Sequence, residues 1–153
     1  MVSAENLVAA IEQARWERFA GPEFYDPERA RQSVRRLALA EDKVAAEAAY
    51  NDVLFGIGNN HAGSYYPAAL CAVPLLVQIS ASGRPWPRYG ALEVLTDLLT
   101  SFQAEPGYEK FEGEPVNLAQ TLHEAMKQAQ LATSDLEASE PDALLAELRA
   151  ATD

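Results

Sequence analysis

Hydrophobic residues recur every three or four positions along most of the chain, which is the spacing of one face of an α-helix. Glycine and proline, which stop helices, gather between these periodic stretches. Ser3 and Asp26 each precede such a stretch and can cap it, and Pro27 suits a first helical position. The pattern predicts six main helices and a C-terminal one, over about residues 3–19, 27–40, 42–57, 66–80, 88–102, 117–129 and 139–148.

The helix predicted over residues 66–80 is apolar almost all the way around, which indicates a position at the centre of its domain. Its densest apolar part, residues 68–79, would extend only ~18 Å as a helix, against the ~30 Å hydrocarbon core of a bilayer. We therefore expect a buried helix rather than a membrane span. A short connector over residues 82–87 follows, so we expect this helix and the next to form an antiparallel pair.

The length of 153 residues suits one globular domain with a single core. We expect an all-α fold, an irregular bundle of about six to seven helices, in one domain that covers residues 1–153. Residues 103–116, called the acidic segment below, interrupt the helical pattern with two prolines, two glycines and four glutamates. We predict a long loop there, and loops of this length are often functional.

Charge is distributed unequally along the chain. The 12 basic and 23 acidic residues give a net charge of -11, which repels phosphate backbones and anionic lipid headgroups. Residues 1–96 hold 11 acidic and 9 basic groups, whereas residues 97–153 hold 12 acidic and 3 basic ones. Acidic surfaces commonly serve only solubility, but this clustering also suits a basic partner. We expect a protein partner with a basic surface, no nucleic acid and no membrane.

The single cysteine, Cys71, excludes a disulfide within the chain. It lies in the apolar helix, where a thiol is more often an inert small hydrophobe than a nucleophile. The two histidines, His61 and His123, have no acids or cysteines beside them at metal-ligand spacing, so we expect no metal and no other cofactor. The N-terminal residues lack the basic and then apolar stretch of a secretory signal, which favours a cytoplasmic protein.

His61 is the residue best placed for chemistry. It follows Asn60 in a polar loop, residues 58–64, and Asp52 lies one helix back, where its carboxylate could orient the imidazole as a general base. No nucleophile or phosphate-binding glycine loop accompanies the pair. A histidine that stabilises its turn is the favoured interpretation, contact of this loop with a partner is the second, and catalysis is the third.

Aromatic residues mark further candidate contacts with a partner. Tyr65 and Trp86 bracket the central helix, and such residues either fill cores or anchor interfaces. Trp86 stands between two prolines, where capping the helical pair and anchoring a partner are equally good interpretations. The acidic segment combines aromatic side chains with carboxylates, a mixture suited to a basic target. Its candidate contact residues are Tyr108, Glu109, Phe111, Glu112 and Glu114.

Four stretches together resemble a bacterial helical-repeat pattern. Residues 50–54 are Tyr-Asn-Asp-Val-Leu, residues 61–69 His-Ala-Gly-Ser-Tyr-Tyr-Pro-Ala-Ala, residues 72–76 Ala-Val-Pro-Leu-Leu and residues 88–95 Arg-Tyr-Gly-Ala-Leu-Glu-Val-Leu. Over about residues 42–102 the chain is similar to HEAT-like repeat proteins, apart from a one-residue shift before the glycine and the doubled tyrosine. No clean second copy of the period follows, so the resemblance implies a short irregular superhelix rather than a long solenoid.

HEAT-like domains usually bind macromolecules and seldom catalyse, so the resemblance implies a non-catalytic protein-binding module. Small acidic proteins of this kind are similar to bacterial immunity proteins, which block a toxin delivered between cells. We therefore expect the chain to neutralise a toxin by covering its basic substrate cleft. A scaffold or secretion adaptor for an effector is the alternative. A small hydrolase or transferase centred on Asp52 and His61 is a third hypothesis.

Overall fold

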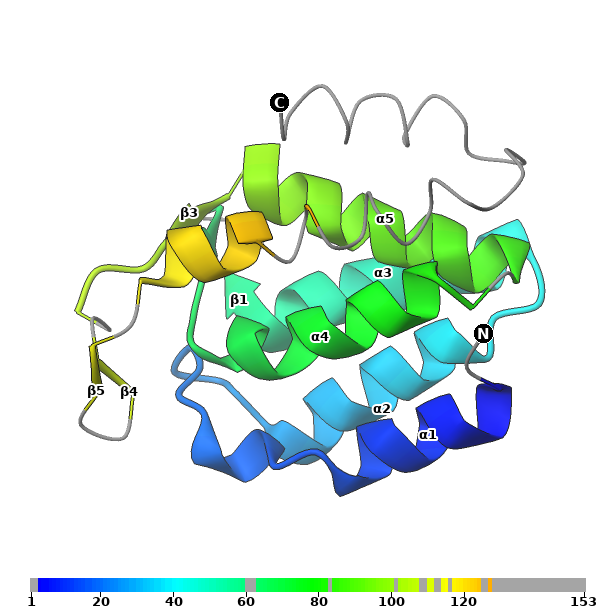
Figure 1. The fold of residues 1–153 in the computed structure, drawn as a ribbon, viewed down its shortest axis with the longest axis horizontal. Helices are drawn as coiled ribbons and strands as arrows, with labels where there is room; N and C mark the ends of the chain where they lie inside the picture. Colours follow the sequence, from blue (N-terminus) through cyan, green and yellow to red (C-terminus); the bar gives the residue numbers. More distant parts are fainter. Residues whose placement is uncertain are drawn as a thin grey trace.

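The structure, a computed structural model, describes residues 3–59, 63–82, 84–100, 102–107, 110–111, 114–115, 117–124 and 127. Helices dominate this part of the chain, which confirms the all-α prediction (Figure 1). They are α1 (Ala4–Gln13), a 3-10 turn η1 (Trp16–Arg18), α2 (Pro27–Ala38), α3 (Lys43–Ile57), α4 (Ala68–Ser80) and α5 (Pro85–Thr100), and residues 118–124 are also helical. The helix predicted over residues 139–148 lies outside the described residues.

Side-chain caps fix the starts of the first three helices. Ser3, Asp26 and Asp42 each accept a hydrogen bond from a first-turn amide, at 3.2, 3.0 and 2.8 Å. Each cap pairs an N–H group that has no partner within its own helix. The predicted caps at Ser3 and Asp26 are confirmed, and Pro27 occupies the first helical position.

The first helix is shorter than predicted. It ends at Gln13 rather than near residue 19, because Ala14 adopts an extended conformation with ψ of 145°. The chain then turns so that the fully buried Trp16 enters the core, where its ring N–H donates to the carbonyl of Ile11 at 3.1 Å. Burial of this large side chain therefore ends a helix that the local pattern would continue.

Short strands lie in two regions that the sequence predicts as loops. They are β1 (Gly58–Asn59), β2 (Ser64–Tyr65), β3 (Gln103–Ala104), β4 (Lys110–Phe111) and β5 (Glu114–Pro115). β1 pairs with β2 antiparallel, β2 pairs with β3 parallel, and β4 pairs with β5 antiparallel. The start of the acidic segment is thus bound to the hairpin that follows α3.

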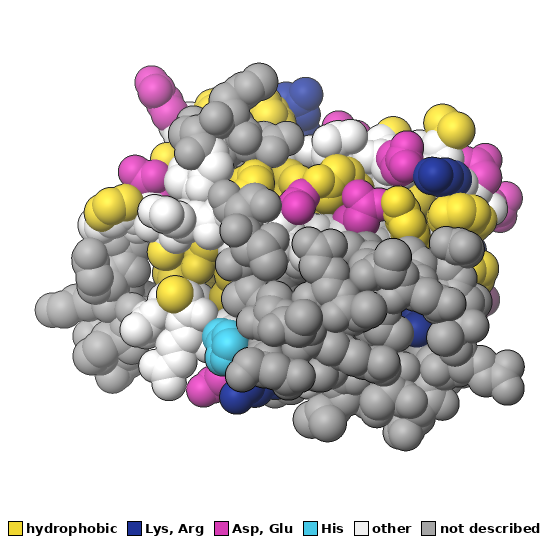
Figure 2. Space-filling view, turned by 90° about the horizontal axis from the view of Figure 1, so that it is seen from above, with side chains coloured by type: hydrophobic (Ala, Val, Ile, Leu, Met, Phe, Trp, Pro, Cys, Tyr) yellow, Lys and Arg dark blue, Asp and Glu magenta, His cyan; other side chains and the backbone are white. Residues whose placement is uncertain are grey.

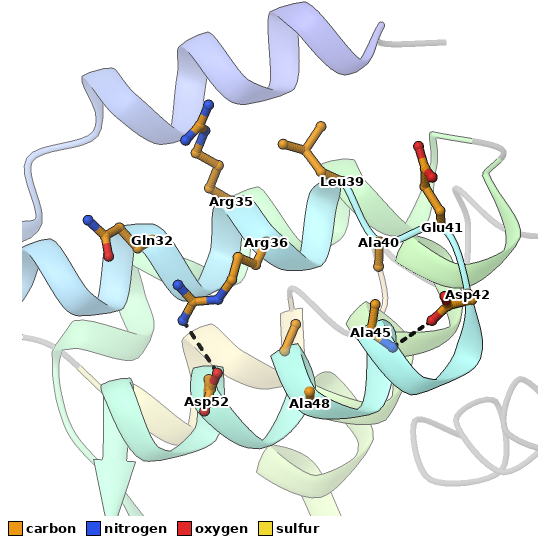
Figure 3. A pocket seen from close by; sticks show the side chains of 11 residues that line it. Gln32, Arg35, Arg36, Leu39, Ala40, Glu41, Asp42, Ala45, Ala48 and Asp52 are labelled. Carbon is orange, nitrogen blue, oxygen red and sulfur yellow. Dashed lines mark hydrogen bonds and ion pairs between the residues drawn. The ribbon is translucent and has the colours of Figure 1, made fainter.

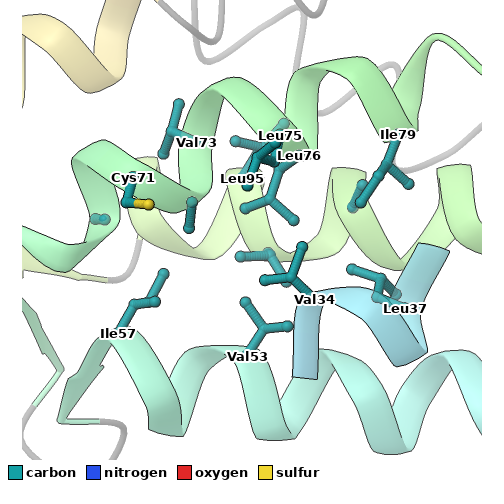
Figure 4. Close-up of a cluster of buried hydrophobic side chains, with 14 of the residues drawn as sticks. Val34, Leu37, Val53, Ile57, Cys71, Val73, Leu75, Leu76, Ile79 and Leu95 are labelled. Atoms are coloured by element: carbon teal, nitrogen blue, oxygen red, sulfur yellow. The ribbon is translucent and has the colours of Figure 1, made fainter. Parts of the chain in front are cut away.

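One hydrophobic core joins the helices, with α4 at its centre as predicted (Figures 1 and 4). Figure 4 shows α4 side chains such as Leu76 and Ile79 packed against Val34 of α2 and Val53 of α3. All four are at most 1% exposed. Because each neighbouring helix buries its apolar face on α4, this helix has little polar surface of its own.

Two further pairs of helices, α2 with α3 and α4 with α5, pack closely. A Cβ on Gly56 would lie 3.4 Å from the Cα of Ala30, so α3 meets the backbone of α2 at this point. α4 and α5 pack side by side in opposite directions, which confirms the predicted pair (Figure 1). The predicted connector over residues 82–87 is too long, because α5 begins at Pro85. Prolines fit this first helical turn, where their missing N–H costs no hydrogen bond.

Candidate functional site

An open groove of about 680 Å³ runs between α2 and α3 (Figure 3). Three alanines of α3, Ala45, Ala48 and Ala49, form part of its wall, and their short side chains leave the space between the helices unfilled. Leu39 lies near one end of the groove, and polar side chains line both edges. The cavity falls in the size range of ligand-binding clefts, but it is open along one side of the molecule.

Ion pairs surround the groove. Arg36 of α2 reaches across to Asp52 of α3, with Nη2 and Oδ2 3.3 Å apart (Figure 3). Arg35, on the other edge of α2, pairs with Glu12 of α1 at 3.5 Å. In both pairs the side chains are about half exposed, and such pairs contribute little to stability. Their charges are therefore available to a molecule that approaches this surface.

Arg31 is less exposed than the other arginines of α2. Its side chain is only 12% exposed and binds Glu17 and Glu28. Hydrogen bonding to Glu17 raises the pKa of Arg31, and the same bond lowers the pKa of Glu17. Arg31 therefore connects α2 with η1 through Glu17, unlike the exposed Arg35 and Arg36.

Exposed large hydrophobic side chains also gather on this helix pair. Among the described residues they are Phe24 just before α2, Leu39 at its end, and Val44 and Phe55 on α3. The rings of Phe24 and Phe55 stack with centroids 4.7 Å apart, and the guanidinium of Arg29 lies 5.7 Å from the centroid of Phe55. These four apolar side chains, together with the groove that Leu39 lines, are called the α2–α3 face below.

The hypothesis of a catalytic pair at Asp52 and His61 gains no support from the geometry. Asp52 is 56% exposed and bound to Arg36, and His61 lies outside the described residues. No cluster of metal-ligating side chains occurs in the described part of the chain. Cys71 is 8% exposed, and burial raises the pKa of its thiol to about 12, so it is almost entirely protonated at neutral pH.

The candidate partner contacts are only partly within the described structure. Tyr65 is 3% exposed and belongs to the core, so its side chain offers almost no surface to a partner. Trp86 is half-buried in the first turn of α5, with its ring edge-on to Tyr89 at 5.6 Å. The side chains of the other candidates lie outside the described residues, namely Asn60, His61, Tyr108, Glu109, Phe111, Glu112 and Glu114.

A second polar cluster lies where α5 packs on α3. The hydroxyl of Tyr50 donates to Asp97, and burial, followed by this bond, raises the pKa of Tyr50. One turn earlier on α5, Glu93 has a buried carboxylate oxygen that makes no hydrogen bond to any described residue. Figure 2 shows the molecule from above, with Asp and Glu side chains next to hydrophobic ones on this side.

Glu93→Gln is expected to raise the free energy of unfolding at about pH 7 by less than about 1 kcal/mol, since solvent screens a partly exposed group. Burial raises the pKa of Glu93, as do Glu47 and Asp97, whereas Tyr89 and Lys43 lower it. The stability that Glu93 contributes is thus complete below its unfolded pKa of about 4.3 and is lost as pH rises through the higher folded pKa.

The gain from glutamine should therefore disappear near pH 3, where Glu93 is protonated in both states. Urea unfolding of both proteins at several pH values measures this difference. Glu23→Gln is the matched control, because Glu23 is exposed, lies outside this cluster and its loss should bring no gain. A Glu93→Gln protein no more stable than the parent at neutral pH would contradict a cost of burying the Glu93 carboxylate.

The α2–α3 face was missed by the sequence predictions, although a signal existed. Val44, Ala48, Asn51 and Phe55 follow one another at spacings of 4, 3 and 4, and all four are exposed on α3.

None of the helices in the described part of the chain combines the length and hydropathy needed to cross a bilayer. The chain matches no protein-family model, no curated protein and no solved structure.

Proposed function

We propose that the chain is a non-catalytic protein-binding module that neutralises a bacterial toxin, as immunity proteins do. The observation that carries the binding function is the α2–α3 face, on which the large exposed hydrophobic side chains of the described residues gather. An apolar surface bordered by charged side chains is typical of protein interfaces. Arg36 pairs with Asp52 and Arg35 with Glu12, and these half-exposed charges border the apolar surface.

The acidic segment supplies the part of the proposal that concerns the toxin. Its first residues are held in place, because the N–H of Glu105 donates to the carbonyl of Tyr65 at 2.9 Å and β3 pairs with β2. The 12 acidic against 3 basic groups of residues 97–153 favour a basic target. Steric cover of a basic cleft needs no chemistry from the inhibitor, and complementary charge accelerates its capture.

Reversing the charges of Glu109, Glu112 and Glu114 to lysine is expected to slow association with the proposed toxin roughly tenfold at low ionic strength. The reason is that these carboxylates would steer a basic surface toward the acidic segment. Stopped-flow or surface plasmon resonance measurements over a range of salt concentrations give the rate.

The matched control reverses three exposed carboxylates outside residues 97–153, Glu5, Glu23 and Glu47, which changes net charge equally. Its association rate should fall much less. An unchanged rate for the first variant at low salt would remove the electrostatic part of the proposal. Co-expression with the toxin tests the function itself, because survival of the host indicates neutralisation, whereas secretion without protection indicates an adaptor.

A further inference from the structure

We infer that the α2–α3 face binds a second copy of this chain, so that two protomers form a symmetric dimer. The face is apolar in part and open, and its charges are arranged in a way that a second copy would complement.

The charges on the two edges of the groove are opposite. Arg29, Arg35 and Arg36 lie on α2, whereas Asp52 lies on α3 and Asp42 at its start. Arg36 and Asp52 are at the same level along the groove, because their charged atoms are 3.3 Å apart. The face therefore presents a basic side and an acidic side in register with each other.

A two-fold axis parallel to the groove would exploit this register. Such an axis keeps the level of every residue and exchanges the two sides, so α2 of one protomer would meet α3 of the other. Arg36 would then face Asp52 of the second copy, twice in each dimer. An axis across the groove would instead place arginines against arginines, which is unfavourable, so the charges select the parallel arrangement.

Net charge does not oppose association at this surface. The whole chain carries a net charge of -11, but residues 27–57, which include α2 and α3, hold five basic and five acidic side chains. Close approach of two such helix pairs therefore brings together neutral surfaces with complementary pattern.

The apolar part of the face suits helix packing. Val44 is 79% exposed and Phe55 38% exposed, and Ala48 lies between them on the same stripe of α3. Spacings of 4, 3 and 4 along this stripe match the seam of packed helices, with exposed Asn51 as its polar member. The short alanine side chains allow a helix of the second copy to approach the groove closely (Figure 3).

Charge exchange tests the dimer. Analytical ultracentrifugation of the full chain at roughly 1 to 500 µM should show a reversible dimer. Arg36→Glu and Asp52→Arg should each weaken it roughly tenfold or more, because each opposes like charges across the two-fold axis. An equimolar mixture of the two variants should recover a heterodimer, and the double variant should recover the homodimer.

Two further variants separate this effect from folding. Val44→Glu places a charge on a side chain that is 79% exposed, so it should keep the fold and weaken the dimer. Lys43→Glu is the matched control, since it reverses one charge at the start of α3 on the side that faces Glu47, and it should leave the dimer intact. Circular dichroism melting curves should be similar for all variants, because the exposed pairs they lose contribute little.

A chain that is monomeric over the whole concentration range overturns the inference, and so does a dimer that none of the exchanges alters. The proposed function assigns a partner to the same face, so a second copy and a toxin would compete for it, and each is measured separately. A monomer that still neutralises toxin removes the dimer alone, and a charge-sensitive dimer that binds no toxin removes the toxin alone.

Discussion

Replacing Trp16 with alanine is expected to lower the free energy of unfolding by about 3–5 kcal/mol, a large part of the stability of a domain of this size. Trp16 is fully buried, and it ends the first helical segment by turning into the core. Its ring N–H donates to Ile11, and its carbonyl accepts from the hydroxyl of Tyr25 at 2.8 Å. Truncation would leave a cavity in the core, and the carbonyl of Ile11 would lose the donor that the ring supplies.

Chemical denaturation followed by circular dichroism measures the loss. Trp16→Phe is the matched control, since it keeps an aromatic ring and removes the N–H donor. Its cost should be smaller than that of alanine, and the difference between the two variants reports the packing of the ring. An alanine variant within about 1 kcal/mol of the parent would show that Trp16 does not hold α1 and η1 on the core.

Local signals predicted the helices well. The caps at Ser3 and Asp26 and the proline at position 27 act within one helical turn, so the residues nearby contain the information that sets these helix starts. The central position of α4 followed from the absence of a polar face. Both properties can be inferred from a short stretch of sequence without knowledge of the neighbours.

Features that depend on distant contacts were not predicted. β2 pairs with β3, which is about 40 residues away in the sequence, and neither strand has more than two residues, so no alternating pattern marks either one. Which side chains of α2 and α3 are exposed also depends on contacts between distant parts of the chain. Only the packed structure distinguishes Arg31, whose side chain is 12% exposed, from the half-exposed Arg36.

The candidate site was predicted from charge and aromatic content, which favoured the acidic segment and the loop at His61. The structure adds a different surface, the α2–α3 face. Phe55 lies opposite the inward stripe of its own helix, so its exposure could have been inferred from the helical period alone. The stacking of Phe24 on Phe55 could not, because Phe24 belongs to the segment before α2.

Gly58→Ala is expected to lower the free energy of unfolding by about 1–3 kcal/mol, because no space exists for the added methyl group. A Cβ at Gly58 would lie 2.4 Å from the carbonyl oxygen of Ser64 and 3.1 Å from the Cα of Tyr65. Both are backbone atoms of β2, so the strands themselves must separate. The backbone of Gly58 is extended, with φ of -159°, so the cost arises from the close approach and not from its conformation.

Gly56→Ala, two residues earlier, is the matched comparison and should have the opposite sign. A Cβ there would meet Ala30 and Ser33 at ordinary contact distances of 3.4 to 3.7 Å, and alanine favours a helix by up to about 1 kcal/mol over glycine. The two variants should also differ in how far the disturbance of the structure extends. Separation of β1 from β2 disturbs the strand that holds Gln103 and Glu105, so Gly58→Ala should reduce the amide-exchange protection of Glu105, whereas Gly56→Ala should not. Equal protection of Glu105 in both variants would mean that the acidic segment is held independently of the hairpin.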